Sequence, residues 1–196
     1  MLFNNNEEIN QALQGIATQD NGDLVINNAD KLRGDILDKL VLNAATNPSA
    51  EIKGLSRFII KSAALELGIV NSSIQGLYET RGRGEIKGFT VPALNIRGLP
   101  YELCRAIFRT AIKTDAGAFI FELAKSEMGY TFQKPQELSA VILAAAIKEG
   151  YKGPVFIQGD HFQVNAKNYA QDKEKEIAGL KTLIEDGIAG GFYNID

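Results

Sequence analysis

The stretch that decides the fold is AFIFELAKSEMGYTFQKPQELSAVILAAAIKEGYKGPVFIQ, residues 118–158. It begins and ends with short runs, residues 118–123 and 155–158, which have the length of strands and are apolar on both faces. Between these runs, residues 135–148 carry the apolar pattern of a helix. Two such strands joined by a helix are typical of a parallel sheet covered by helices, because a parallel connection needs a crossover segment. The stretch therefore predicts an α/β fold.

The same alternation continues on both sides of this stretch. Upstream, an apolar run at residues 89–96 is followed by a helical pattern at about 99–113. Downstream, a helical pattern at about 172–187 precedes a last apolar run at 192–196. This gives about four βα units, whereas a complete (βα)8 barrel takes about 250 residues. We therefore expect residues 86–196 to form the first half of a TIM barrel and the chain to be a truncated part of a longer protein.

Residues 1–85 have a different pattern, in which apolar positions recur three and four residues apart. This spacing predicts helices. The Asn-Pro-Ser segment at 47–49 offers a break and an N-cap between two of them, and Asn71-Ser72-Ser73 can cap another. The predicted organisation is an all-helical N-terminal extension, residues 1–85, which precedes the half barrel. We interpret the extension as a packing appendage.

Composition and charge narrow the classes of partner. The net charge is only −3 and the 21 Lys and Arg residues are scattered, which argues against a nucleic-acid or anionic membrane surface. No apolar run approaches the roughly 20 residues of a membrane span, and the N-terminus lacks the pattern of a signal peptide. The single Cys104 cannot form an internal disulfide and is expected on the buried face of its helix. We expect a cytoplasmic protein, and its charge is compatible with a small anionic substrate.

Polar side chains stand at the carboxyl ends of the expected strands, namely Asn95, Glu122, Asp160 with His161, and Asp196. The carboxyl ends of parallel strands meet on one rim, where α/β enzymes build their sites. His161 is the only histidine and directly follows a carboxylate, which favours a metal ligand or an acid/base group. A hydrogen-bonded histidine in a surface loop is the alternative. For Asn95, Glu122 and Asp196 the alternative is capping or hydrogen bonding at the rim.

Three segments together resemble a known family: FTVPALNI at 89–96, VFIQGDHF at 155–162 and FYNID at 192–196. They are similar to the amino-terminal half of the class II, metal-dependent fructose-bisphosphate and tagatose-bisphosphate aldolases, over about residues 75–196. The second strand region, FIFELAKSEMGYT at 119–131, is more similar to the subgroup that includes the tagatose-bisphosphate aldolase partner subunit.

The resemblance implies roles for individual residues. His161 would be a ligand of the catalytic divalent metal, usually zinc, and Asp160 would be the acid/base that exchanges a proton with the aldehyde's oxygen. Asn95, Glu122 and Asp196 occupy rim positions from which they can orient ligands or substrate hydroxyls.

The resemblance also implies a function in carbohydrate metabolism. The full-length protein would be a lyase that cleaves a ketose bisphosphate, its phosphorylated sugar substrate, to dihydroxyacetone phosphate and glyceraldehyde 3-phosphate, and we expect it to be a homo-oligomer. In the family the remaining metal ligands and the phosphate-binding loops lie in later strands, so we expect the fragment to be inactive alone. The alternative is a non-catalytic partner subunit that stabilises a bisphosphate aldolase.

Overall fold

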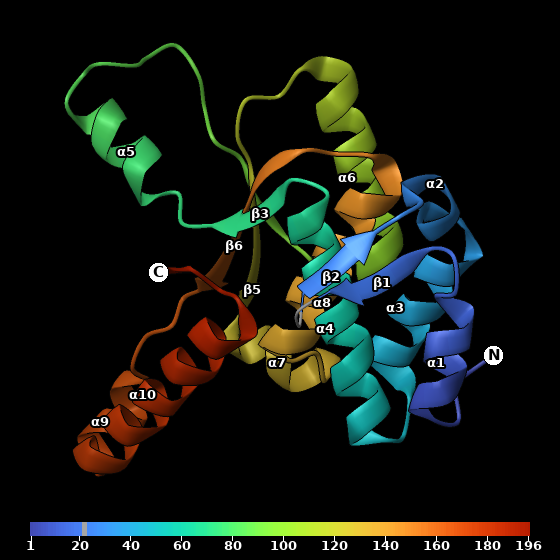
Figure 1. Ribbon diagram of the computed structural model, residues 1–196. Coiled ribbons are helices and arrows are strands. Elements are labelled where there is room, and N and C mark those ends of the chain that lie inside the picture. The colour runs from blue at the N-terminus through green and yellow to red at the C-terminus, as the bar shows by residue number, and fades with distance from the viewer. Residues whose placement is uncertain (21–22) are drawn as a thin grey trace. The chain divides into compact units, whose positions relative to one another are not determined.

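The computed structural model describes residues 1–20 and 23–196 and shows a mixed α/β protein (Figure 1). The chain divides into two compact units, each built from three separate segments. The segments of the first unit are Met1–Val70, Leu99–Ala116 and Ala140–Pro154. Those of the second unit are Asn71–Gly98, Gly117–Ser139 and Val155–Asp196. Over the described residues, no helix is both long enough and apolar enough to cross a membrane.

The first unit is mainly helical. Its elements are α1 (Asn6–Ala12), β1 (Ala17–Asp20), β2 (Asp23–Ile26), α2 (Ala29–Lys31), the π-helical turn η1 (Leu32–Ile36), α3 (Leu37–Thr46), α4 (Ala50–Glu66), α6 (Pro100–Thr114) and the larger part of α8 (Pro135–Glu149). The cap predicted before α4 is confirmed, because the Ser49 side chain accepts the backbone N–H of Ile52. Apolar residues that include Leu37, Ile60 and Phe108 are buried in this unit.

A few polar contacts join α8 and α6 to the turn before α3 and to α3 itself. The Lys148 ammonium group donates to the Gly34 carbonyl at 3.0 Å and to Asp38 at 2.7 Å, and the Tyr101 hydroxyl donates to the same carboxylate at 2.8 Å. Cys104 lies fully buried on α6, as predicted. Burial raises the pKa of its thiol, so this cysteine behaves as an apolar core residue and not as a nucleophile.

The prediction that residues 1–85 are all-helical is wrong in two places. β1 and β2 form an antiparallel pair, with Ala17 opposite Ile26, and β3 (Ile69–Ser72) joins the main sheet. These strands are only four residues long. Over so short a run, apolar spacing does not separate a strand from a helical turn, and the β-branched residues of Val25-Ile26 and Ile69-Val70 are the better signal.

The main sheet belongs to the second unit, although β3 and β6 begin in the first. β4 (Ala93–Asn95), β5 (Ile120–Ala124), β6 (Gly153–Asp160) and β7 (Asn194–Ile195) pair in this order and are parallel, and β3 also pairs with β6. The other helices of this unit are α5 (Gln75–Gly82), α7 (Lys125–Thr131), α9 (Ala166–Gln171) and α10 (Lys173–Gly190). Parallel strands joined by helices confirm the predicted α/β class.

The first strand of the predicted barrel is shorter than its apolar run. Only Ala93–Asn95 of the expected residues 89–96 pairs as a strand. Pro92 has no N–H and cannot donate to a ladder, although its carbonyl accepts the Ile120 N–H at 2.9 Å. The proline therefore marks where regular pairing begins.

Candidate functional site

The register of β4, β5, β6 and β7 aligns one polar residue from each strand. Asn95 pairs with Glu122, and Glu122 pairs with Gln158. Gln158 in turn pairs with Asn194. Because side chains alternate between the two faces of a sheet, these four residues share one face. Asp160, two residues beyond Gln158, points to the same face nearer to the carboxyl end of β6.

Apolar packing covers the amino-terminal half of this face. Ile120 and Phe156, each two residues before a member of the polar row, pack against Ile74 at the start of α5. Asn194 fixes this contact, because its Oδ1 accepts the Ile74 N–H at 2.8 Å and its Nδ2 donates to the Ile157 carbonyl at 3.1 Å. Asn194 is therefore a structural anchor, and the accessible polar groups lie beyond it.

Three of the predicted site residues lie together at the carboxyl end of the sheet. The His161 Nε2 atom lies 3.7 Å from Asp160 Oδ1, and its Nδ1 atom lies 3.8 Å from Asp196 Oδ2. One ligand atom from each residue lies within 4.8 Å of the others. The His161 side chain is 67% exposed, whereas that of Asp160 is 14% exposed. The structure thus presents an accessible imidazole beside a largely covered carboxylate.

The backbone around His161 is tightly constrained. The Asp196 N–H donates to the Gly159 carbonyl at 2.9 Å, and the Phe162 N–H donates to the Asp196 carbonyl at 2.7 Å. His161, between these two contacts, has a φ of 52°, in the left-handed region that non-glycine residues rarely adopt. This turn aims the imidazole away from β6 while Asp196 stays beside it.

The turn also depends on Gly159. A Cβ atom added to this glycine would lie 2.5 to 2.8 Å from three atoms of the Phe162 ring. The ring is rigid and is itself buried, so it can give way only if the turn moves. Gly159 therefore permits the close approach that shapes the segment bearing Asp160 and His161.

A Gly159→Ala variant is expected to be less stable than the wild type by about 1–3 kcal/mol, the usual cost of overpacking a filled site. Urea denaturation measures this difference. Gly179→Ala is the control, because it adds the same methyl group on an exposed position of α10 with no atom within 4 Å, and it should gain up to about 1 kcal/mol from the higher helix propensity of alanine. Equal stability of Gly159→Ala and the wild type would contradict the proposed packing.

Glu127, which the sequence analysis missed, organises the polar row from α7. Its Oε2 atom accepts the Ala124 N–H at 2.8 Å and the Asn95 Nδ2 group at 2.9 Å, and its Oε1 accepts from Arg97. Burial acts to raise the pKa of Glu127, but the hydrogen bonds from Ala124, Arg97 and Asn95 outweigh it and hold the pKa below its usual value. The Asn95 amide also lies 3.4 Å from Asp160 Oδ2, so Glu127 orients a group that contacts Asp160.

Glu122 is the carboxylate of the row and is buried, with 8% of its surface exposed. The Gln158 amide donates to it at 3.3 Å. Its pKa is raised, first by burial and then by the neighbouring carboxylates of Asp160, Glu127 and Asp196. Glu122 therefore holds its proton more tightly than an ordinary glutamate does.

In metal-free protein, a Glu122→Gln variant is expected to be more stable than the wild type at neutral pH. A raised pKa in the folded state means that the contribution of Glu122 to stability is complete below the pKa of the unfolded chain and is lost as the pH rises through the folded pKa. Glutamine keeps the shape without the charge. The stability gain should therefore appear as the pH rises and vanish in acid.

Urea denaturation between pH 4 and pH 8 measures this difference, and an exposed Glu174→Gln variant serves as the control. A gain in stability that did not change with pH would show that burial of the Glu122 charge is not the cause.

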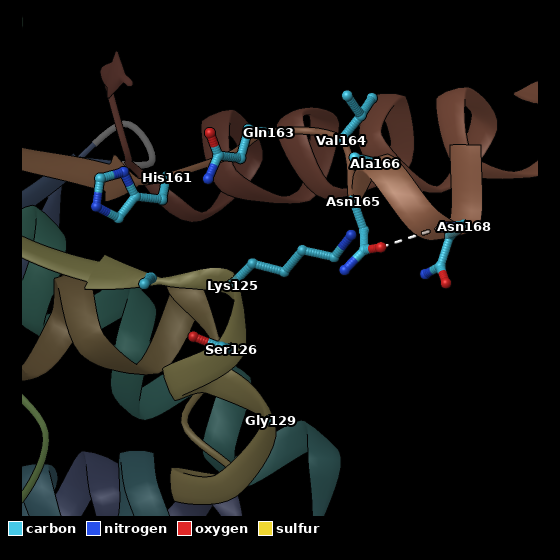
Figure 2. A pocket seen from close by; sticks show the side chains of 10 residues that line it. Lys125, Ser126, Gly129, His161, Gln163, Val164, Asn165, Ala166 and Asn168 are labelled. Carbon is cyan, nitrogen blue, oxygen red and sulfur yellow. Dashed lines mark hydrogen bonds between the residues drawn. The ribbon is translucent and has the colours of Figure 1, made fainter. Parts of the chain in front are cut away.

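A hollow of about 770 Å³ opens beside His161 (Figure 2). Its polar lining comes from Lys125 and Ser126 of α7, from His161 and Gln163 after β6, and from Asn165 and Asn168 at the start of α9. The Asn165 side chain accepts the backbone N–H groups of Lys167 and Asn168 and so caps α9. The short helix α9 thus walls the hollow on this side.

The donor types of His161 and Asp196, an imidazole nitrogen and a carboxylate oxygen, suit a divalent cation. Zinc binds imidazole nitrogen and carboxylate oxygen at about 2.0–2.2 Å, which places tetrahedral ligands about 3.4 Å apart. The observed separations of 3.7 and 3.8 Å involve different nitrogens of the imidazole, Nε2 beside Asp160 and Nδ1 beside Asp196. Because a single cation binds only one of these nitrogens, Nδ1 and Asp196 could share the cation, while Asp160 lies beside the other nitrogen.

Comparison with protein-family models, with curated proteins and with solved structures finds no significant match to this chain. The resemblance of residues 75–196 to the class II aldolases therefore stays a prediction, and the chemistry has to be tested on the site itself.

Proposed function

We propose that the protein is a metal-dependent aldolase, or part of one, that cleaves fructose- or tagatose-bisphosphate with zinc or a similar divalent cation. The observation that carries the proposal is the grouping of Asp160, His161 and Asp196 at the carboxyl ends of neighbouring parallel strands. We also propose that β4 to β7 belong to a (βα)8 barrel, because they are parallel and adjacent in chain order.

The proposed roles follow from the exposure and contacts of each residue. His161 and Asp196, the more exposed pair, would hold the cation together with a further protein ligand, which the resemblance places in a later strand, and an open position would be left to substrate. A bound cation supplies Lewis-acid stabilisation of the negative charge that develops on the substrate's carbonyl oxygen. Asp160 stays beside the pair, with its Oδ2 facing the Asn95 amide, and would transfer the proton. Glu122 would bind a substrate hydroxyl.

The test uses the protein at its full natural length. The protein is stripped of metal, reloaded with zinc and assayed for cleavage of fructose 1,6-bisphosphate and of tagatose 1,6-bisphosphate, with the bound metal measured in parallel. Cleavage of either sugar that is lost on stripping and restored by zinc is the expected result. Failure to bind zinc would overturn the proposal.

Zinc binding without cleavage of either sugar would also overturn the enzyme proposal, and the partner-subunit alternative would take its place. That alternative predicts that the protein raises the thermal stability of a bisphosphate aldolase when the two are mixed. The similarity of residues 119–131 to the partner-subunit subgroup is the feature that motivates this comparison.

A further inference from the structure

The charges around the candidate site are unevenly distributed. The polar row and the cluster at its carboxyl end contain the carboxylates of Glu122, Asp160 and Asp196, which repel an anionic ligand. Of the ten described residues that line the hollow, Lys125 alone carries a permanent positive charge. An anionic group that enters the hollow would therefore find its favourable partner on the α7 wall.

The Lys125 side chain is placed to meet such a group. Lys125 is the first residue of α7, directly after β5, and its side chain is 44% exposed. Figure 2 shows it extended along the hollow toward Asn165. Its ion-pair partner is Glu176 of α10, but the distance between Nζ and Oε1 is 3.8 Å, which is beyond hydrogen-bond range.

Lys125 contributes less to stabilising the Glu176 carboxylate than the hydrogen bond from the Asn165 backbone does. The backbone N–H of Asn165 donates to the same Oε1 atom at 2.8 Å, and this hydrogen bond is the largest cause of its lowered pKa. Glu176 would keep this contact if the lysine turned toward a ligand. The long ion pair therefore keeps Lys125 beside the hollow and leaves its ammonium group able to turn toward a ligand.

We infer that Lys125 is the anion-binding residue of the hollow and holds the phosphate or carboxylate group of a small hydroxylated ligand whose other end reaches His161. The neutral donors and acceptors of Ser126, Gln163 and Asn168 suit the hydroxyl groups between these two ends. This inference rests on the proposed function for the ligand's reacting end only. The volume of about 770 Å³ lies within the range of about 300–1,000 Å³ that is typical of small-molecule sites.

Calorimetric titration of metal-free protein tests the inference with three probes. Dihydroxyacetone phosphate supplies a phosphate group, glycerate supplies a carboxylate, and dihydroxyacetone has no charge. At least one anionic probe is expected to bind the wild type more tightly than dihydroxyacetone does. The anionic probe that binds more tightly identifies the class of anion.

Variants at both ends of the ion pair make the test specific. Lys125→Ala is expected to weaken the binding of the anionic probe at least tenfold and to leave the binding of the neutral probe unchanged. Lys125→Arg should retain most of the affinity for the anionic probe. Glu176→Gln should strengthen anion binding, because it removes the competing carboxylate. Lys167→Ala, at an exposed position of α9, is the matched control and should bind as the wild type does. Circular dichroism confirms that each variant is folded.

The inference is overturned if the wild type binds neither anion, or if Lys125→Ala binds both as the wild type does. These measurements use neither metal nor turnover, so their outcome is separate from that of the proposed function. If the protein cleaves the sugar bisphosphate but binds anions equally well with and without Lys125, this inference alone is overturned. Anion binding that depends on Lys125, in a protein that binds no zinc, would remove the aldolase proposal alone.

Discussion

Zinc titrated into the His161→Ala variant is expected to bind at least about 100-fold more weakly than to the wild type. Residues that only support a metal ligand are worth about 10- to 100-fold in affinity, and a direct nitrogen ligand should be worth at least as much. The loss should be large here because Asp196, the other proposed ligand in this cluster, is a carboxylate, and zinc favours a site that includes imidazole. Calorimetric titration with zinc measures the effect.

The backbone conformation of His161 suggests a second variant that also removes the imidazole. Because φ is 52° there, alanine keeps the strain of the wild-type residue, whereas glycine adopts this conformation freely. His161→Gly should therefore lose zinc affinity as His161→Ala does, yet it should be more stable than His161→Ala by about 1 kcal/mol. If either variant bound zinc as tightly as the wild type, His161 would not be a ligand. Asp186→Asn, at an exposed position of α10, serves as the control for the assay.

The convergence of the strand ends was predictable from the sequence because it follows from topology. Once residues 118–158 are recognised as a strand, a helix and a parallel strand, their carboxyl ends must lie on one edge of the sheet. This places Asp160 and His161 near the end of β7, where the structure has Asp196. The residues that pair across neighbouring strands could not be predicted, because the register depends on how the strands align in the sheet.

Glu127 shows the limit of this reasoning. It lies in α7, a seven-residue helix that the sequence analysis did not predict, and its role comes from contacts with Asn95 and Arg97, about thirty residues earlier in the chain. One local signal was present: Glu127 stands three residues after Ala124, and its carboxylate accepts the Ala124 N–H as in a capping box. Such a signal marks the start of a helix, but it does not reveal the tertiary contacts.

Short strands were missed for a related reason. The β1 and β2 hairpin lies in a region whose apolar spacing is mostly helical, and each strand contributes only four residues to the pattern. Hydrophobic periodicity over so few residues does not separate a strand from a turn of helix.

An Asp160→Asn variant of the full-length protein is expected to keep its zinc affinity within a few fold and to lose turnover by about 10²–10⁴-fold, the usual contribution of a general acid or base. Asparagine has the same shape and can still accept from the Asn95 Nδ2 group through its side-chain carbonyl oxygen, so the segment from Gly159 to Phe162 should remain in place. It cannot accept and return a proton. Parallel measurements of bound zinc and of bisphosphate cleavage separate the two effects, with Asp186→Asn as the control.

The comparison with Glu122→Gln decides which carboxylate transfers the proton. Glu122 is the more enclosed of the two, and its raised pKa would suit an acid/base group equally well. Asp160 is favoured because it lies 3.7 Å from the imidazole, whereas Glu122 contacts the Gln158 amide further down the strand. If Glu122→Gln abolished turnover while Asp160→Asn spared it and weakened zinc binding, Asp160 would be a metal ligand and Glu122 the proton carrier. Both variants keep their side-chain size, so the order of their effects on cleavage and on zinc affinity reports chemistry and not packing.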